Sequence, residues 1–258
     1  MTTDLTRPAA VLAAAVASDP GRPRLTWYDD VAGERIELSA RVMANWVSKA
    51  GNLLQDDADA GPGTTVGLDL PPHWRTLYWA LAAWTVGATV VTGDDATGAD
   101  VLVTADPAAA AAHGGDAVLV NLAALARSHP RAAEAPAAVD EARELATHGD
   151  QLTVMADPDD EDLALVPAPA SVDGGTPGSG TAYAGIVVPR AHWGQSPRVA
   201  LSASGELGAV LLDALAAWAA DGSIVLVRPA EVAEPTETSD SSDSSERLTS
   251  EGVTVDAR

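Results

Sequence analysis

Residues 63–91 read GTTVGLDLPPHWRTLYWALAAWTVGATVV, and this stretch decides the fold. Residues 64–70 are an apolar run that two adjacent prolines end, which predicts a strand. A helix is expected over residues 73–86, because apolar side chains cover most of its circumference and Gly87 follows as a helix-ending residue. Residues 88–92 are a second apolar run. This order predicts parallel strands joined by a helical crossover, and a helix that is apolar nearly all round is buried or has a partner.

Apolar runs on both sides of this stretch predict further strands, and segments with helical spacing lie between them. We therefore expect an α/β protein with a layered, mostly parallel sheet and flanking helices. The clearest additional unit is a strand–helix–strand crossover over residues 199–227. The expected helices are residues 8–18, 39–55, 122–128, 139–147 and 207–220, and the expected strands are residues 25–28, 34–38, 101–104, 117–120, 163–166, 199–202, 224–227 and 252–255.

Composition divides the chain into three parts. Residues 1–229 hold the predicted α/β domain, and residues 248–258 are a C-terminal strand or tail. Residues 230–247 between them are acidic and rich in Ser and Thr. Such a segment cannot bury enough apolar surface to order itself, so we expect it to be disordered.

The net charge and the residue counts exclude several classes of function. Thirty-seven acidic residues against fifteen basic ones give a charge of −22, which repels nucleic acid and anionic membranes. No cysteine is present, and no two of the five histidines have the spacing of a helical zinc site. No signal peptide or membrane-spanning stretch is evident, so the expected location is the cytoplasm. The acidity reflects either simple solubility or adaptation to salt.

Three stretches resemble the adenylate-forming superfamily of acyl-CoA synthetases, luciferases and nonribosomal-peptide adenylation domains. Residues 25–54 are similar to the opening hairpin and helix of that family. Residues 63–91 are similar to its strand, its substrate-side helix and the Gly-Ala turn that follows. Residues 207–227 are similar to the crossover after its phosphate loop. The resemblance implies the fold of a truncated, N-terminal part of such an enzyme.

The chemistry that the resemblance implies is the activation of a carboxylate by ATP. It needs a phosphate loop that contains lysine, acidic groups for magnesium and ribose, and a C-terminal domain that supplies a second lysine. The loop position falls in residues 167–180, which contain glycines but no lysine, and Lys49 on the first long helix is the only lysine. The sequence therefore predicts a non-catalytic protein with no catalytic, cofactor-binding or metal-binding residues and no cofactor. It would bind a partner protein or a small ligand.

An enzymatic alternative stays open for the Gly-rich loop. A divergent acyl-CoA synthetase-like or nucleotide-binding protein would hold an anion through the backbone amides around Gly174 and Gly175. A second alternative is a small-ligand module with an acyl pocket near His192 and Trp193. A homodimer or a protein partner would use an apolar helix face that remains exposed.

Two further motifs have a structural and a functional interpretation. His73 opens the helix of residues 73–86, where a histidine held neutral can polarise a ligand, although a capping-turn residue is the commoner role. Ser202 and Ser204 suit a hydrolase nucleophile, but the sequence has no Gly-x-Ser-x-Gly elbow.

Overall fold

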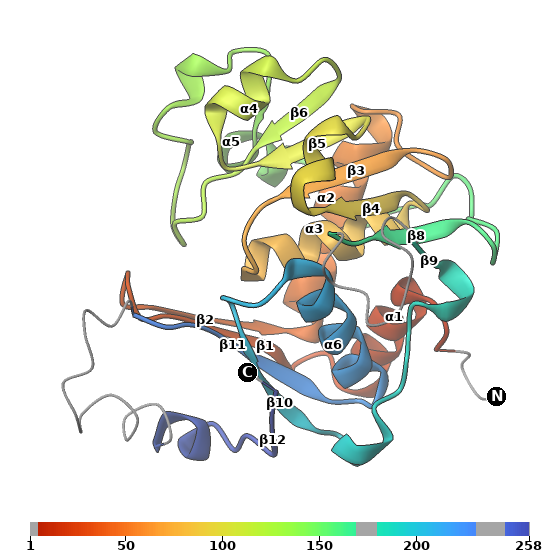
Figure 1. Cartoon of the computed structure of the whole chain (residues 1–258), viewed down its shortest axis with the longest axis vertical. Coiled ribbons are helices and arrows are strands. Elements are labelled where there is room, and N and C mark those ends of the chain that lie inside the picture. Colours follow the sequence, from red (N-terminus) through yellow and green to blue (C-terminus); the bar gives the residue numbers. More distant parts are fainter. Residues whose placement is uncertain (1–4, 169–179, 231–245, 258) are drawn as a thin grey trace.

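The computed structural model describes residues 5–168, 180–230 and 246–257, and Figure 1 shows their arrangement. In this part of the chain the strands form two sheets, of five strands in the order β12-β10-β11-β1-β2 and of seven strands in the order β7-β6-β5-β3-β4-β8-β9. All neighbouring strands are parallel except the pairs β1–β2 and β8–β9. The strands are β1 (Pro23–Asp29), β2 (Glu34–Ser39), β3 (Thr65–Asp69), β4 (Thr89–Thr92), β5 (Val101–Thr104), β6 (Asp116–Leu119), β7 (Val139–Asp140), β8 (Leu163–Val166), β9 (Thr181–Ala182), β10 (Arg198–Ser202), β11 (Ser223–Arg228) and β12 (Val255–Asp256).

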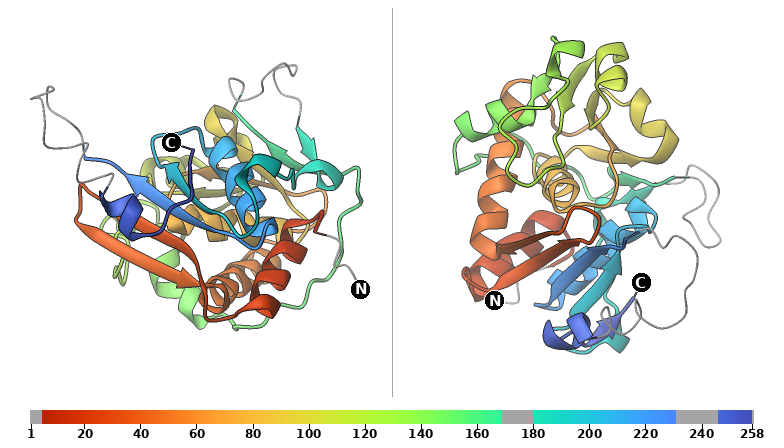
Figure 2. Two further views of the ribbon diagram at one scale, coloured as in Figure 1. Left: turned by 90° about the horizontal axis from the view of Figure 1, so that it is seen from below. Right: turned by 90° about the vertical axis from the view of Figure 1, so that its left-hand side faces the viewer.

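Helices fill the space between the two sheets (Figures 1 and 2). The α-helices are α1 (Pro8–Ser18), α2 (Ala40–Asp56), α3 (Trp74–Thr85), α4 (Pro107–Ala112), α5 (Glu141–Glu144) and α6 (Leu207–Ala219), and the 3₁₀ turns are η1 (Gly93–Gly98), η2 (Ala132–Glu134), η3 (Leu145–Thr147), η4 (Tyr183–Gly185) and η5 (Ala191–Trp193). α4 and η1 cover the outer face of the seven-stranded sheet. α3 contacts β1 of the five-stranded sheet and also β3 and β4 of the seven-stranded sheet. It therefore forms the centre of a layered structure.

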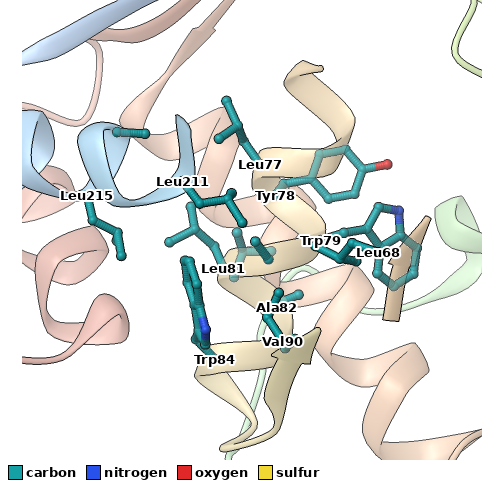
Figure 3. Close-up of a cluster of buried hydrophobic side chains, with 14 of the residues drawn as sticks. Leu68, Leu77, Tyr78, Trp79, Leu81, Ala82, Trp84, Val90, Leu211 and Leu215 are labelled. Carbon is teal, nitrogen blue, oxygen red and sulfur yellow. The ribbon is translucent and has the colours of Figure 1, made fainter. Parts of the chain in front are cut away.

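The amino-acid sequence of α3 explains its central place. Every side chain from Trp74 to Trp84 is buried. Figure 3 shows Leu211 and Leu215 of α6 with the core side chains on one side of the helix, and Leu68 and Val90 of the seven-stranded sheet on the other. Burying one large apolar side chain contributes roughly 1.5–3 kcal/mol. Other elements of the same chain therefore cover α3 on all sides.

Most of the predicted elements are confirmed to within a residue or two. The hairpin of β1 and β2 forms, and the Ser39 side chain accepts a hydrogen bond from the backbone N–H of Val42 at 3.3 Å to cap α2. β10, α6 and β11 form the predicted parallel crossover. The fold class expected from the sequence, a mostly parallel α/β architecture, is confirmed.

The helix expected over residues 122–128 is wrong, because this segment forms turns. The Arg75 guanidinium accounts for the difference. It donates to the carbonyl oxygens of Ala123 at 3.3 Å and Ala124 at 3.4 Å, which an α-helix would use internally. The Asn121 side chain also accepts a hydrogen bond from the backbone N–H of Ala123 and donates one to the carbonyl oxygen of Ser128.

Two other expected elements are shifted along the chain. The helical piece expected from residue 139 begins at Glu141, because residues 139 and 140 pair with β6 as β7. The last strand is β12, which pairs with β10, rather than residues 252–255. Residues 169–179 of the expected phosphate loop and residues 231–245 of the acidic segment lie outside the described residues. Within the described residues, no helix is both long and apolar enough to cross a membrane.

Candidate functional site

The carboxyl edge of the seven-stranded sheet contains a crevice that follows from the strand connections. After β3 the chain enters α3, whereas after β4 it enters η1. These two connections lie on opposite faces: a Cβ on Gly67 would lie 1.9 Å from the carbonyl oxygen of Ala96 in η1, whereas Leu68 lies among the core side chains with α3 (Figure 3). Adjacent parallel strands with connections on opposite faces leave a crevice at their carboxyl ends, and α/β proteins bind ligands there.

A cavity of about 530 Å³, here named cavity 1, occupies this crevice. Three carboxylate side chains line it, those of Asp69, Asp94 and Glu206. Its walls come from the ends of β3 and β4, the start of the segment after β8, and the loop that leads into α6. The lining residues are Leu68, Asp69, Leu70, Pro71, Pro72, Gly93, Asp94, Thr97, Ala168, Gly205, Glu206 and Leu207.

The N-terminus of α6 faces cavity 1 with a carboxylate already in place. Glu206 is the N-cap residue, and its Oε1 accepts from the backbone N–H of Gly208 at 2.8 Å while its Oε2 accepts from that of Ala209 at 2.7 Å. Free N–H groups at a helix N-terminus commonly bind phosphate. Here the Glu206 carboxylate takes that position, so a phosphate would have to displace a negative charge of the protein.

A second cavity, of about 460 Å³ and here named cavity 2, lies at the carboxyl edge of the five-stranded sheet. It shares Pro71 and Pro72 with cavity 1, so the two cavities have a common wall. Side chains from the ends of β1, β10 and β11 and from the start of α3 surround it. The lining residues are Trp27, Asp29, Val31, Ala32, Glu34, Pro71, Pro72, His73, Leu122, Ala123, Ala203, Ser204, Arg228 and Pro229.

His73 is the N-cap of α3 and is held neutral in the wall of cavity 2. Its Nδ1 accepts from the backbone N–H of Arg75 at 3.2 Å, and its ring meets the Trp27 ring edge-on with 4.6 Å between centroids. Only 3% of the surface of His73 is exposed. Burial, together with the charges of Arg75 and Arg228, lowers the pKa of His73 to about 3 against the opposing effect of Asp29. The ring therefore carries no charge near neutral pH.

Asp29 and Arg228 form an ion pair at the rim of cavity 2. The Arg228 guanidinium lies 3.2 Å from Asp29 Oδ2, and Asp29 Oδ1 accepts from the backbone N–H groups of Val31 and Ala32. These contacts also decide the hydrolase hypothesis. Ser204, His73 and Asp29 line one cavity, but His73 Nδ1 is occupied by a backbone N–H rather than facing the carboxylate. A Ser-His-Asp relay is therefore not formed.

A buried polar cluster behind α3 holds the wall of cavity 2 in place. Arg75 and Glu141 form a salt bridge at 2.9 Å with 5% and 0% of their side chains exposed, and the Tyr78 hydroxyl also donates to Glu141. Burial raises the pKa of both Glu141 and Tyr78. Because Arg75 also binds the carbonyls of Ala123 and Ala124, this cluster positions the loop that closes one side of the cavity.

The other residues that the sequence singled out lie away from both cavities or outside the described residues. Lys49 lies 2.8 Å from Asp150 and donates to the carbonyl oxygens of residues 146 and 148. Trp193 is buried in the main core, and neither cavity is lined by it or by His192. Gly174 and Gly175 lie outside the described residues. No group of three or more potential metal ligands occurs among the residues with described positions.

Sequence reasoning named His73 and Ser204 but missed the residues that accompany them. Trp27, Asp29 and Arg228 reach cavity 2 from strand ends that are distant in sequence, and no local pattern marks them. Glu206 was also missed, although an acidic residue just before the apolar run of residues 207–220 is a recognisable helix-start signal.

Comparison with curated proteins supplies the family. A "TIGR03089 family protein" of Mycobacterium tuberculosis (strain ATCC 25618 / H37Rv) is 38% identical over 165 residues, which are 61% of this chain and 67% of that protein. The chain belongs to the TIGR03089 family. No family model matches the sequence.

Solved structures of adenylate-forming enzymes share the fold of this TIGR03089 family member. The N-terminal domain of FACL13 from Mycobacterium tuberculosis matches with a TM-score of 0.65 and 12% identity over 96% of this chain and 61% of that chain. An acyl-CoA synthetase of Brucella canis matches with a TM-score of 0.67 and 15% identity over 96% of this chain and 46% of that chain. The NpsA N-terminal subdomain of Klebsiella oxytoca was solved in complex with 3-hydroxyanthranilyl-AMSN. It matches with a TM-score of 0.62 and 15% identity over 95% of this chain and 57% of that chain. The chain thus spans about half of the length of these proteins. The resemblance to the N-terminal part of the superfamily, expected from the sequence, is confirmed for the fold.

Proposed function

We propose that this protein binds a small molecule in the adjoining cavities 1 and 2, at the carboxyl edges of the two sheets, and that the chain does not form adenylates by itself. The observation that carries the proposal is the Glu206 carboxylate at the N-terminus of α6, where a phosphate would otherwise bind. The location supports binding, because the crevice lies at the carboxyl ends of parallel strands. The cavity volumes also fall within the range of small-molecule sites.

The charges around cavity 1 support the proposal that the chain does not form adenylates by itself. Its walls bring together Asp69, Asp94 and Glu206, and no arginine or lysine lines it among the described residues. Transfer of an adenylyl group from ATP to a carboxylate brings anionic groups together and therefore requires positive charge near the reacting atoms. Lys49 is the only lysine of the chain and is held by Asp150 and by carbonyl groups elsewhere. A nucleoside triphosphate is therefore repelled from cavity 1.

An ATP–pyrophosphate exchange assay with the purified chain tests this proposal. We expect no exchange above the background without protein when acetate, long-chain and aromatic acids are supplied in turn. A thermal-shift screen of neutral, acidic and acyl-CoA ligands runs in parallel, because a ligand that binds the folded state raises its apparent stability. Robust exchange that depends on both ATP and an added acid would refute the proposal.

A second candidate is nucleotide binding through the Gly-rich loop, and one observation favours it. Ala168, the last residue before the undescribed segment, lines cavity 1 and packs close to Gly93. The described part of the chain therefore reaches the edge of cavity 1 at residue 168. Saturable ATP binding that disappears when Gly174 and Gly175 are replaced by bulkier residues would favour this candidate. The homodimer or protein partner, the absence of a cofactor and the cytoplasmic location stay predictions.

A further inference from the structure

Two residues that line cavity 2, Trp27 and His73, carry a side-chain N–H group with no hydrogen-bond acceptor among the described residues. The first is the buried indole Nε1–H of Trp27, a residue that is 1% exposed. The second belongs to His73: its Nδ1 accepts a backbone N–H, so the proton of the neutral ring lies on Nε2, which makes no hydrogen bond to any described residue. A buried donor without a partner, such as the Trp27 Nε1–H, destabilises the folded protein. An acceptor atom that enters the cavity would recover this cost.

Trp27 differs in position from the other tryptophans whose indole Nε1–H has no hydrogen-bond partner among the described residues. Trp74 and Trp79 also have an Nε1 without a hydrogen-bond partner among the described residues, but neither lines cavity 1 or cavity 2. Trp27 lines cavity 2 together with His73, and the two rings are in edge contact. The pair therefore forms one donor site, and Trp79 provides a matched control.

The charged groups around cavity 2 restrict the ligand that these donors can bind. Asp29 and Glu34 both line the cavity, whereas Arg228 is the one cationic side chain among its lining residues and already pairs with Asp29. An organic acid would bring a further negative charge next to two carboxylates. A neutral ligand avoids this repulsion, and an N–H group on it can donate to Asp29 or Glu34.

We infer that cavity 2 binds a small neutral amide, whose carbonyl or ring acceptor receives the N–H groups of Trp27 and His73 and whose own N–H faces the carboxylates of Asp29 and Glu34. This inference rests on the proposed binding function and adds its place and its chemical class. A cavity of about 460 Å³ accommodates a one- or two-ring compound.

Two pairs of probes that match in shape and differ in charge test the inference. Nicotinamide and nicotinate form one pair, and benzamide and benzoate form the other. Each is titrated to about 10 mM, which detects millimolar affinity, while the indole N–H resonances are followed by NMR of the ¹⁵N-labelled full chain. The Trp27→Phe and Trp79→Phe variants assign the two resonances. We expect both amides to shift the Trp27 resonance and not that of Trp79, and the matching acids to bind at least about tenfold more weakly.

The substitutions then test the two donors separately. Trp27→Phe keeps an aromatic ring and removes the N–H, and we expect amide affinity to fall about three- to tenfold. His73→Asn keeps an N-cap residue, removes the Nε2 donor and gives a similar loss, so the test stands even if the tryptophan variant does not fold. Trp79→Phe, at an equally buried position, leaves the affinity unchanged.

The inference is overturned if the acids bind as well as the amides, or if Trp79→Phe weakens binding as much as Trp27→Phe. It is also overturned if none of the four probes moves the Trp27 resonance. Shifts of Leu70 and Gly205 at cavity 1, with Trp27 unmoved, would refute this site while leaving binding in the crevice intact.

Discussion

The buried, neutral His73 makes the stability of the fold depend on pH in a way that one substitution can isolate. Its pKa falls from 6.5 in the unfolded chain to about 3 in the folded protein. Below pH 6.5 the unfolded chain gains a proton on this residue and the folded protein does not. The contribution of His73 to stability is therefore fully present above pH 6.5 and is lost as the pH falls towards 3. Each pH unit in this window costs about 1.4 kcal/mol, so His73 alone removes about 2 kcal/mol between pH 6.5 and 5.

The assay is urea unfolding followed by tryptophan fluorescence at several pH values between 7.5 and 5. His73→Asn retains a residue that caps helices well and cannot take up a proton in this range, so its free energy of unfolding should depend less on pH. His192→Asn is the matched control, because His192 is exposed and its substitution should leave the pH dependence of the wild type unchanged. Equal pH dependence in the wild type and His73→Asn would refute the reasoning and would imply that His73 is not buried as a neutral ring.

Two other substitutions test the scaffold around the crevice. Glu141→Ala leaves the guanidinium of Arg75 buried without its partner and should cost about 3–5 kcal/mol in the free energy of unfolding, with a smaller loss for Glu141→Gln, as measured by chemical denaturation. A loss below about 1 kcal/mol for the alanine variant would show that the pair is solvated. Gly67→Ala places a methyl group 1.9 Å from the backbone oxygen of Ala96 and should cost about 3 kcal/mol or more. Gly98→Ala meets no atom within 4 Å and should stay within about 0.5 kcal/mol of the wild type, and equal thermal denaturation curves for the two glycine variants would contradict this packing.

The predicted elements agree with the structure where their causes are local. The hairpin of β1 and β2, the Ser39 cap and the crossover of residues 63–91 are marked by apolar spacing, capping residues and turn residues, all within a few positions along the chain. Residues 122–128 have a similar helical composition but form turns. Their carbonyl groups are bound by Arg75, which is about fifty positions earlier, and no local pattern contains that information.

The candidate site depends even more on contacts between distant segments. His73 stands out in the sequence as a histidine at a helix start, yet its neutrality comes from burial beside Trp27 and Arg75. Arg228 meets Asp29 across 199 positions, and Ser204 reaches the same cavity from a third segment. Local backbone preference and apolar periodicity were therefore enough to predict most of the helices and strands and the α/β class. The cavities and their charges required the folded chain, because desolvation and ion pairing act between side chains that only tertiary packing brings together.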